Sequence, residues 1–252
     1  MAFRTEPGRS AARFPQGRIG FAVGDIHGRA DLLARMFDEI EKLAPAPHAA
    51  APVVVFLGDY VDRGPDSAEV LALLLQTGRP EGFERRFLKG NHEQALLAFL
   101  DDPVRARDWL LHGGQETLVS YGVAPPPWGA GQTVLQAAAA KFLEALPARH
   151  LDFLRALEPS FVAGDYLFAH AGVDPAKPAD AQSERDLCWI RRRFLEDKRA
   201  YTHVVVHGHT PCATPYRDHR RIGLDTGAYA SGQLSAARFE GEDVVLFTVA
   251  AP

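Results

Sequence analysis

The chain has 252 residues, of which 46% are hydrophobic and 24% are charged, and its formal net charge is −4. This size and apolar content allow one large domain with a buried core, and we expect a single domain over residues 1–252. The slightly acidic balance offers no basic face of the kind that nucleic acids require, and no apolar run reaches the length of a membrane span. We therefore expect neither a nucleic-acid partner nor a membrane.

The two cysteines, Cys188 and Cys212, are too few for a disulfide framework and do not form a Cys-x-x-Cys pair. We expect both to be reduced thiols in the core. Residues 1–16 lack the apolar stretch of a secretion signal, so the sequence predicts a soluble, cytoplasmic protein.

Strand-like and helix-like patterns alternate over the first hundred residues. Short apolar runs predict strands over residues 18–23, 52–57 and 86–89. Apolar residues at helical spacing separate and follow these runs, and alternation of this kind predicts an α/β sandwich. In such folds the ligands gather on loops beyond the carboxyl ends of the strands. The predicted helices cover residues 31–43, 67–76 and 92–100.

Residues 103–159 differ from the segments on either side. Their pattern is mostly helical, with the clearest helix over 137–146, and the Pro125-Pro126-Pro127 turn interrupts it. We interpret 103–159 as a helical cap subdomain, inserted between loops of the predicted site, that could select substrates.

Strand patterns return at residue 160. The runs 160–169, 203–207 and 221–224 predict further strands. The chain then closes with 234–239 and 244–249, which we expect to pair as an antiparallel hairpin. The sequence therefore predicts mixed rather than purely parallel sheets.

Four glycine-containing polar strings stand where predicted strands end. Asp, Asn and His side chains are the oxygen and imidazole ligands that divalent metals take, and glycine lets the backbone turn sharply close to a ligand. The strings therefore predict one metal site. They are Gly24-Asp25-Ile26-His27-Gly28, Gly58-Asp59-Tyr60-Val61-Asp62-Arg63-Gly64, Gly90-Asn91-His92-Glu93 and His207-Gly208-His209-Thr210.

Six side chains account for a dinuclear centre. Asp25 and His27 are two residues apart in an extended segment, so they project to the same side and would hold the first cation. Asp59 follows the next strand and would bridge two cations with its two oxygens. Two divalent cations, less the charges of two aspartates and a bridging hydroxide, leave positive charge facing an anion such as phosphate. The second cation would take the remaining ligands, Asn91, His170 and His209.

An acid pair is expected beside the ligands. His92 follows Asn91 and would donate a proton to the leaving alkoxide. Asp62, three residues after Asp59, would orient the imidazole and stabilise its charged form.

Two arginines are expected to bind the substrate phosphate. Arg63 can fork onto two phosphate oxygens in a geometry that lysine does not offer. Arg191 is expected to complete the clamp from a helix that Trp189 anchors. Asn91 is also expected to contact the phosphate.

Some of these residues have structural interpretations as well. Asp25 is also a reasonable residue to begin a helix. His207 could face the same site, but we do not assign it as a ligand. Asp225 is expected to fix a loop near the site, and His150 and His219 are expected at the surface.

The motifs Gly-Asp-x-His-Gly, Gly-Asp-x-Val-Asp-Arg-Gly and Gly-Asn-His-Glu, followed by His170-Ala171-Gly172 and Gly208-His209-Thr210, resemble those of the calcineurin-like metallophosphoesterase superfamily. Within it the chain is similar to bacterial and phage serine/threonine protein phosphatases of the phosphoprotein-phosphatase type. The resemblance implies a four-layer architecture, in which helices flank a central β-sandwich of two mixed sheets. It also implies the same ligands, acid pair and arginine clamp, and two divalent cations, manganese in the usual bacterial members or else iron or zinc.

Pro211 narrows the resemblance. Many other metallophosphoesterases continue Gly-His-x-His and use the last histidine as an extra ligand of the first metal. Proline at this position cannot supply that ligand. In this respect the sequence resembles the protein-phosphatase branch and the related diadenosine tetraphosphate hydrolases.

The sequence thus predicts a metal-dependent phosphatase whose bridging hydroxide hydrolyses phosphate monoesters, in the first place phosphoserine and phosphothreonine in proteins. The alternative is a dinucleoside polyphosphate such as diadenosine tetraphosphate, because the same centre can cleave phosphoanhydrides. In that case Trp109, Tyr121 and Trp128 of the cap are candidates to stack a base. A non-catalytic scaffold that binds phosphoproteins is a third hypothesis, which the intact ligand set opposes.

Overall fold

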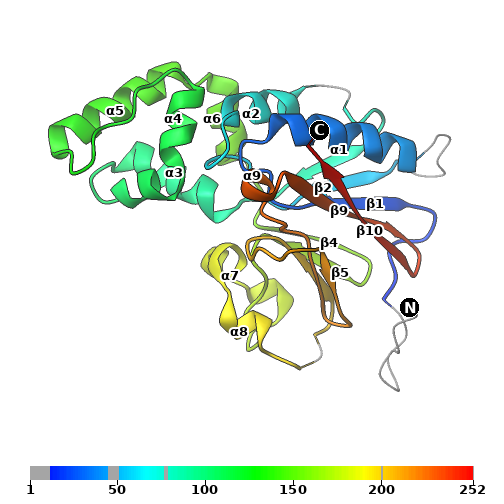
Figure 1. The fold of residues 1–252 in the computed structure, drawn as a ribbon. Helices are drawn as coiled ribbons and strands as arrows, with labels where there is room; N and C mark the ends of the chain where they lie inside the picture. The colour runs from blue at the N-terminus through cyan, green and yellow to red at the C-terminus, as the bar shows by residue number, and fades with distance from the viewer. Residues whose placement is uncertain (1–11, 45–50, 77–78, 200, 252) are drawn as a thin grey trace.

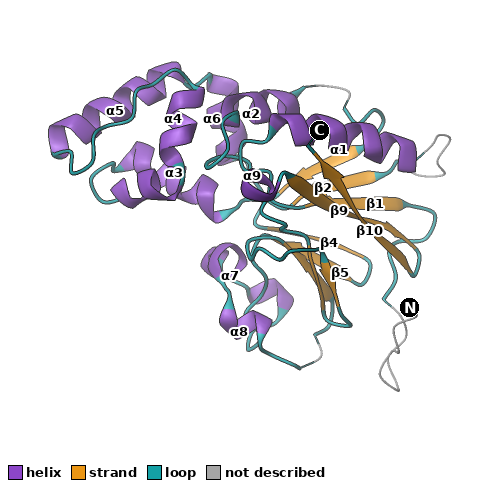
Figure 2. Cartoon of the chain, in the orientation of Figure 1, coloured by secondary structure: helices purple, strands orange, loops and turns teal. Residues whose placement is uncertain are grey.

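The computed structural model describes residues 12–44, 51–76, 79–199 and 201–251. Most of the predicted N-terminal segment, residues 1–11, therefore lies outside the described residues. Two five-stranded sheets face each other, and helices lie outside both of them (Figures 1 and 2). This is the expected α/β sandwich with mixed sheets. In the described part of the chain, no helix is long and apolar enough to cross a membrane.

The first sheet has the strand order β10-β9-β1-β2-β3. Its parallel part consists of β1 (Ile19–Val23), β2 (Val53–Phe56) and β3 (Glu84–Phe87). The predicted terminal hairpin is confirmed, because β9 (Gln233–Glu240) pairs antiparallel with both β10 (Asp243–Ala250) and β1.

The second sheet has the order β4-β5-β6-β8-β7. The predicted strand over 160–169 is wrong as one piece: it is a hairpin of β4 (Ser160–Ala163) and β5 (Tyr166–Ala169), which Gly164 turns with a φ of 57°. The other strands are β6 (Val204–His207), β7 (Tyr216–Arg217) and β8 (Arg221–Gly223). The two-residue β7 carries too short a pattern to be predicted.

The third predicted strand is also displaced. We expected residues 86–89, but β3 spans Glu84–Phe87, and Leu88 makes only an isolated bridge to Glu158. The charged residues of β3 concealed it, since Arg85 and Arg86 offer no apolar run.

Helices cover both sheets and form the middle of the chain. The cap region contains helices as predicted, although the helix expected over 137–146 is displaced, since α5 begins at residue 132 and ends at 145. The helices are α1 (Ala30–Leu43), α2 (Ser67–Leu75), α3 (Asn91–Asp101), α4 (Gly114–Ser120), α5 (Gln132–Ala145), α6 (Ala148–Arg155), α7 (Glu184–Trp189), α8 (Arg192–Leu195) and α9 (Ala228–Ser231), with short 3-10 turns at Arg107–His112 and Ala179–Ala181.

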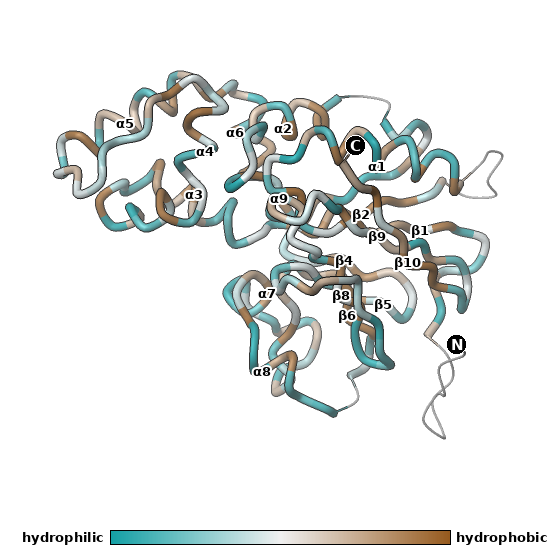
Figure 3. The backbone as a smooth tube through the Cα atoms, viewed as in Figure 1, coloured by the Kyte–Doolittle hydropathy of each residue, from teal (hydrophilic) through white to brown (hydrophobic). Residues whose placement is uncertain are grey.

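Buried apolar side chains form three layers between the four layers of backbone. Alternate residues of β2 serve two of them: Val54 and Phe56 face the α1 side, whereas Val53 and Val55 face the second sheet. This is why β2 reads as a continuous apolar run rather than an alternating one. A third cluster packs α7 and α8 against the outer face of the second sheet. Hydrophobic stretches accordingly follow the strands in Figure 3.

The helical segment after α3 shares the first of these cores. Phe142 of α5 is fully buried and stacks near Trp109, whose ring lies 4.8 Å from that of Phe99 in α3. The cap is therefore packed against the helix that follows β3 rather than attached by its ends alone.

Candidate metal centre

The six predicted metal ligands lie together on loops that follow strands. Asp25 and His27 follow β1, Asp59 follows β2, and Asn91 begins α3. The parallel strands bring these loops to one edge of the sandwich, as the rule for α/β sheets requires. All six side chains are buried, the last two following β5 and β6, namely His170 and His209.

Three lone pairs converge at the predicted second cation. His170 Nδ1 donates to the carbonyl of Leu57 at 2.9 Å, which leaves Nε2 as an acceptor. That Nε2 lies 3.0 Å from Asn91 Oδ1 and 3.2 Å from His209 Nδ1. Acceptors held this close favour a cation between them.

Asp59 faces both predicted cation positions. Its Oδ1 lies 3.4 Å from His170 Nε2, and its Oδ2 lies 3.5 Å from His27 Nε2. His27 Nδ1 donates to the carbonyl of Val61 at 2.8 Å, so His27 also turns a lone pair toward Asp59. One carboxylate oxygen per position is the arrangement that a bridging ligand needs.

The residues fit a pair of divalent metal ions. Asp25 Oδ2 accepts the backbone N–H of His209 at 3.0 Å, but Asp25 Oδ1 and His209 Nε2 are buried and lack a hydrogen-bond partner among the described residues. Any side chain at position 208 would strike Asp25 Oδ1, which explains the glycine. Two groups of metal-capable side chains share Asp59, namely His27 with His92 and His170 with His209.

Burial favours the neutral form of His27 and His209. It lowers the pKa of His27 to about 3 and the pKa of His209 to about 2, with the nearby charge of His170 adding to the latter shift. Burial acts in the same direction on His170, but the charge of Asp59 outweighs it, and the net shift of that pKa is upward. Neutral imidazole is the form that binds metals. Burial, together with the charges of Asp225 and Asp59, raises the pKa of Asp25 well above its usual value. A cluster of buried carboxylates therefore calls for compensating positive charge.

His92 and Asp62 form the predicted pair. His92 Nδ1 lies 2.7 Å from Asp62 Oδ2. Burial acts to lower the pKa of His92, but Asp59 and Asp62 outweigh it, and the net shift is upward. Asp62 also accepts from Trp109 Nε1 at 2.8 Å and from Thr117 Oγ1 at 2.6 Å. Trp109 and Thr117, both in the predicted cap, thus hold the Asp62 carboxylate beside His92.

The two predicted phosphate-binding arginines differ in how they are held. Arg63 Nη2 lies 3.1 Å from His92 Nε2, beside the acid pair. Arg191 is exposed and lies close enough to His209 for its charge to help lower that pKa. The expected anchoring was wrong: α7 ends at Trp189, which is 46% exposed, while Leu187 and Cys188 are the buried residues and Arg191 precedes α8.

Glu93 was not assigned a role from the sequence. Its carboxylate is fully buried and accepts the backbone N–H groups of Asp59 and Gly90, both at 2.9 Å, and of Tyr60 at 2.8 Å. It therefore ties the loop after β2 to the start of α3. Its place in the Gly-Asn-His-Glu string was the available signal.

Left-handed backbone conformations of non-glycine residues coincide with the predicted site in the described part of the chain. Among the described residues, the non-glycine residues with positive φ are His27, Asp59, Asp62, Arg63 and His209, at 44° to 73°. Aspartate and histidine tolerate this region better than most residues, whereas arginine is unusual there. Conformations of this kind cluster at functional sites.

The contacts of His207 and His150 and the positions of the two cysteines differ in part from the expectations. His207 Nδ1 donates to the carbonyl of Gly208 at 2.9 Å and its Nε2 accepts from Arg221 at 3.1 Å, so no lone pair of His207 is left for a metal. The prediction that His150 lies at the surface was wrong: His150 is in α6, and α6 buries it against Tyr121. Cys188 is buried as expected, but Cys212 is exposed.

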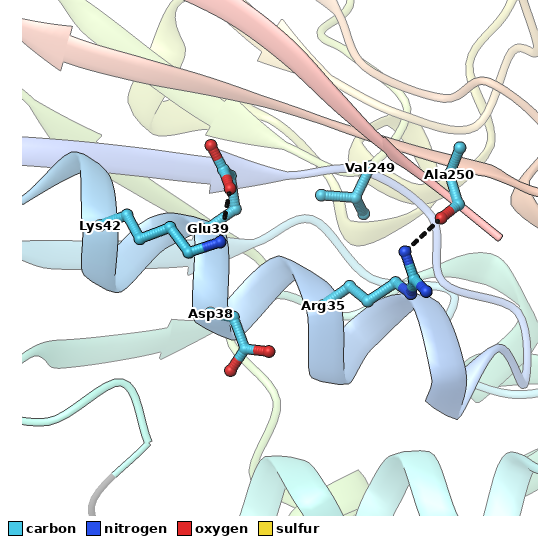
Figure 4. A pocket seen from close by; sticks show the side chains of 6 residues that line it. All are labelled: Arg35, Asp38, Glu39, Lys42, Val249 and Ala250. Carbon is cyan, nitrogen blue, oxygen red and sulfur yellow. Dashed lines mark hydrogen bonds and ion pairs between the residues drawn. The ribbon is translucent and has the colours of Figure 1, made fainter. Parts of the chain in front are cut away.

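A surface pocket lies elsewhere, between α1 and the end of β10 (Figure 4). Three of its charged residues form ion pairs, Lys42 with Glu39 at 3.3 Å and Asp38 with Arg79, and Arg35 donates to the carbonyl of Ala250. None of the predicted site residues lines it.

A β-sandwich that gathers Asp, Asn and His side chains at the ends of its strands is suited to hold metal ions. The family model for calcineurin-like phosphoesterases matches residues 21–247, and the chain belongs to this family.

Three known proteins illustrate the similarity. Serine/threonine-protein phosphatase 1 of Salmonella typhimurium is 31% identical over 228 residues, covering 87% of this chain and 91% of that protein. Bis(5'-nucleosyl)-tetraphosphatase PrpE (asymmetrical) of Bacillus velezensis is 27% identical over 245 residues, covering 88% and 90%. The solved cold-active protein-tyrosine phosphatase of a Shewanella species shares the fold, with a TM-score of 0.60 at 15% identity over 95% of this chain and 83% of that one.

Proposed function

We propose that this phosphoesterase hydrolyses phosphate monoesters of serine and threonine in proteins. The carrying observation is the buried pair of His92 and Asp62, 2.7 Å apart, beside the group of metal-capable side chains. Serine and threonine alkoxides are poor leaving groups, so their release depends on a proton donor. A histidine oriented by a buried carboxylate supplies one.

In this proposal some of the site residues would hold the metal ions, and the others would bind the substrate. Asp25, His27 and Asp59 would hold one cation, and the ligands around His170 the other. Two divalent cations there, manganese in our proposal, would lower the pKa of a water and offset phosphate charge. The remaining site residues act on the substrate.

Arg63 and Arg191 would bind phosphate oxygens, with the Asn91 amide as a further contact. His92 Nε2, which now lies 3.1 Å from Arg63 Nη2, would give its proton to the leaving oxygen. Asp62 would hold the Nδ1 proton and stabilise the imidazolium. The similarity to the Salmonella phosphatase over most of both chains supports this substrate class.

The second candidate is hydrolysis of a dinucleoside polyphosphate. The similarity to PrpE favours it, because that match covers 90% of a bis(5'-nucleosyl)-tetraphosphatase. The cap offers one exposed stacking surface, since Trp128 is 82% exposed, whereas Trp109 is buried and donates to Asp62. A nucleotide leaving group is more acidic than an alkoxide and needs His92 less.

A substrate panel tests the two candidates. Purified protein, with its metal content measured in the same sample, is assayed on phosphoserine and phosphothreonine peptides and on diadenosine tetraphosphate. We expect higher kcat/KM on at least one phosphopeptide. Higher kcat/KM on diadenosine tetraphosphate than on every phosphopeptide would overturn the proposal in favour of the second candidate.

The role of His92 is tested with leaving groups of different acidity. His92→Asn should lower kcat on an alkyl phosphate by about 10² to 10⁴, and by less on p-nitrophenyl phosphate, because that leaving group departs without a proton. His219→Asn, at an exposed histidine, is the matched control. Equal losses on both substrates would refute proton donation by His92.

A further inference from the structure

Tyr229 is a half-exposed aromatic residue at the edge of the metal centre that no motif had singled out. It belongs to the short helix α9, and its side chain is 39% exposed. Its ring lies edge-on to the imidazole of His27, with 5.5 Å between ring centroids. The guanidinium carbon of Arg63 lies 4.8 Å from the centre of the same ring. Tyr229 thus joins a predicted metal ligand to a predicted phosphate ligand.

Two side chains fix the backbone just before this tyrosine. Arg29, in the loop after β1, donates to the carbonyl of Ala228 at 2.9 Å. Asp225 Oδ1 accepts the backbone N–H of Gly227 at 2.8 Å, and Gly227 has a φ of 64° that favours glycine. The segment that carries Tyr229 is therefore tied to the loop after β1, which carries the predicted ligands Asp25 and His27.

Arg63 is oriented by groups other than carboxylates. Within the described ranges, no carboxylate forms an ion pair with Arg63; the closest side-chain contacts are His92 Nε2 at 3.1 Å and the Tyr229 ring. An aromatic face holds a guanidinium in one plane without neutralising it. The positive charge stays available to an anion.

From this geometry we infer that Tyr229 is a positioning residue, which holds the guanidinium of Arg63 in the plane that meets the substrate phosphate. The inference rests on the proposed role of Arg63 as a phosphate ligand. It assigns Tyr229 no contact with the reacting atoms. The aromatic ring of Tyr229, and not its hydroxyl, orients the guanidinium.

Substitution of the ring separates these alternatives. Tyr229→Leu keeps an apolar side chain but removes the aromatic face, and should lower kcat/KM about 5- to 30-fold. Tyr229→Phe keeps the face and should stay within about twofold of the parent. Affinity for inorganic phosphate, measured by calorimetry on the metal-loaded protein, should follow the same order. Equal losses in both variants would overturn the inference, because the hydroxyl would then be responsible.

The coupling to Arg63 is tested in a double-mutant cycle on phosphate affinity, which stays measurable when turnover is slow. Arg63→Ala should weaken phosphate binding, and adding Tyr229→Leu should then change little further. A full additional loss in the Arg63→Ala background would overturn the inference, since Tyr229 would act by another route. An Arg63→Ala variant with unchanged affinity would instead refute the proposed role of Arg63. Metal content and melting temperature are measured for each variant so that misfolding is recognised.

Discussion

Thr117→Val tests whether the cap holds the acid pair. Thr117 lies in α4, 55 residues from Asp62 along the chain, and its hydroxyl donates to Asp62 Oδ1 at 2.6 Å. The same hydroxyl accepts the backbone N–H of Asp62 at 2.9 Å. Valine has nearly the same shape, so the substitution removes polar contacts without leaving a large cavity.

The expected losses of stability and of kcat follow from the contacts that Asp62 keeps in the Thr117→Val variant. The backbone N–H of Asp62 keeps Ser67 Oγ at 3.0 Å, so it stays satisfied. The buried carboxylate loses one charge-assisted hydrogen bond, which is worth about 1.5 to 3 kcal/mol in the free energy of unfolding. Burial already raises the pKa of Asp62, and the loss should raise it further. A carboxylate that has lost one of its donors is held less firmly beside His92 Nδ1, so kcat should fall about 3- to 30-fold.

Urea unfolding of the metal-loaded protein measures the stability, and kcat on an alkyl phosphate measures the catalytic effect. Thr117→Ser is the matched control, because it keeps the hydroxyl and removes only a methyl group. A Thr117→Val protein with parental kcat and a change in unfolding free energy below about 0.5 kcal/mol would refute the reasoning.

Three further predictions concern the metal centre and the cap. Asp59→Asn replaces two equivalent oxygens by one, so metal content measured by mass spectrometry should fall and hydrolysis should be lost; parental content would contradict a bridging role. Removal of metal by a chelator should lower the melting temperature by about 5 to 10 °C, because the convergent lone pairs lose their cation; an unchanged temperature would argue against metal binding. Burial lowers the pKa of His150, so its contribution to stability is present above the unfolded value near 6.5 and is lost as the pH falls below it. His150→Gln should therefore reduce the loss in melting temperature between pH 7.5 and pH 5.5, and an identical loss would contradict this.

The clustering of the predicted ligands at one edge of the sandwich follows from the sequence because local pattern and topology agree. Asp25, Asp59 and Asn91 each follow a strand or its flanking loop, and parallel neighbours bring the ends of those strands to one edge. The apolar runs and the polar strings that end them are therefore enough to place these three side chains. The terminal hairpin was predictable for the same reason, since two apolar runs flank a short charged turn.

The supports of the site could not be predicted from local pattern. Trp109 and Thr117 hold Asp62 across 47 and 55 residues, and no spacing rule connects them. Trp189 was misplaced because aromatic residues usually anchor helices, whereas here Leu187 and Cys188 face the core. His150 looked like a surface residue in its sequence context, but tertiary packing buries it.

The predicted cap carries exposed side chains, and the same segment supplies two of the three side-chain donors that hold Asp62 in place. A change in α4 or in the turn that carries Trp109 would reach His92 through Asp62, even when it leaves every predicted metal ligand untouched. Differences in substrate choice among related chains should consequently be traceable to cap residues that point away from Asp62, since residues that point toward it are constrained by proton transfer.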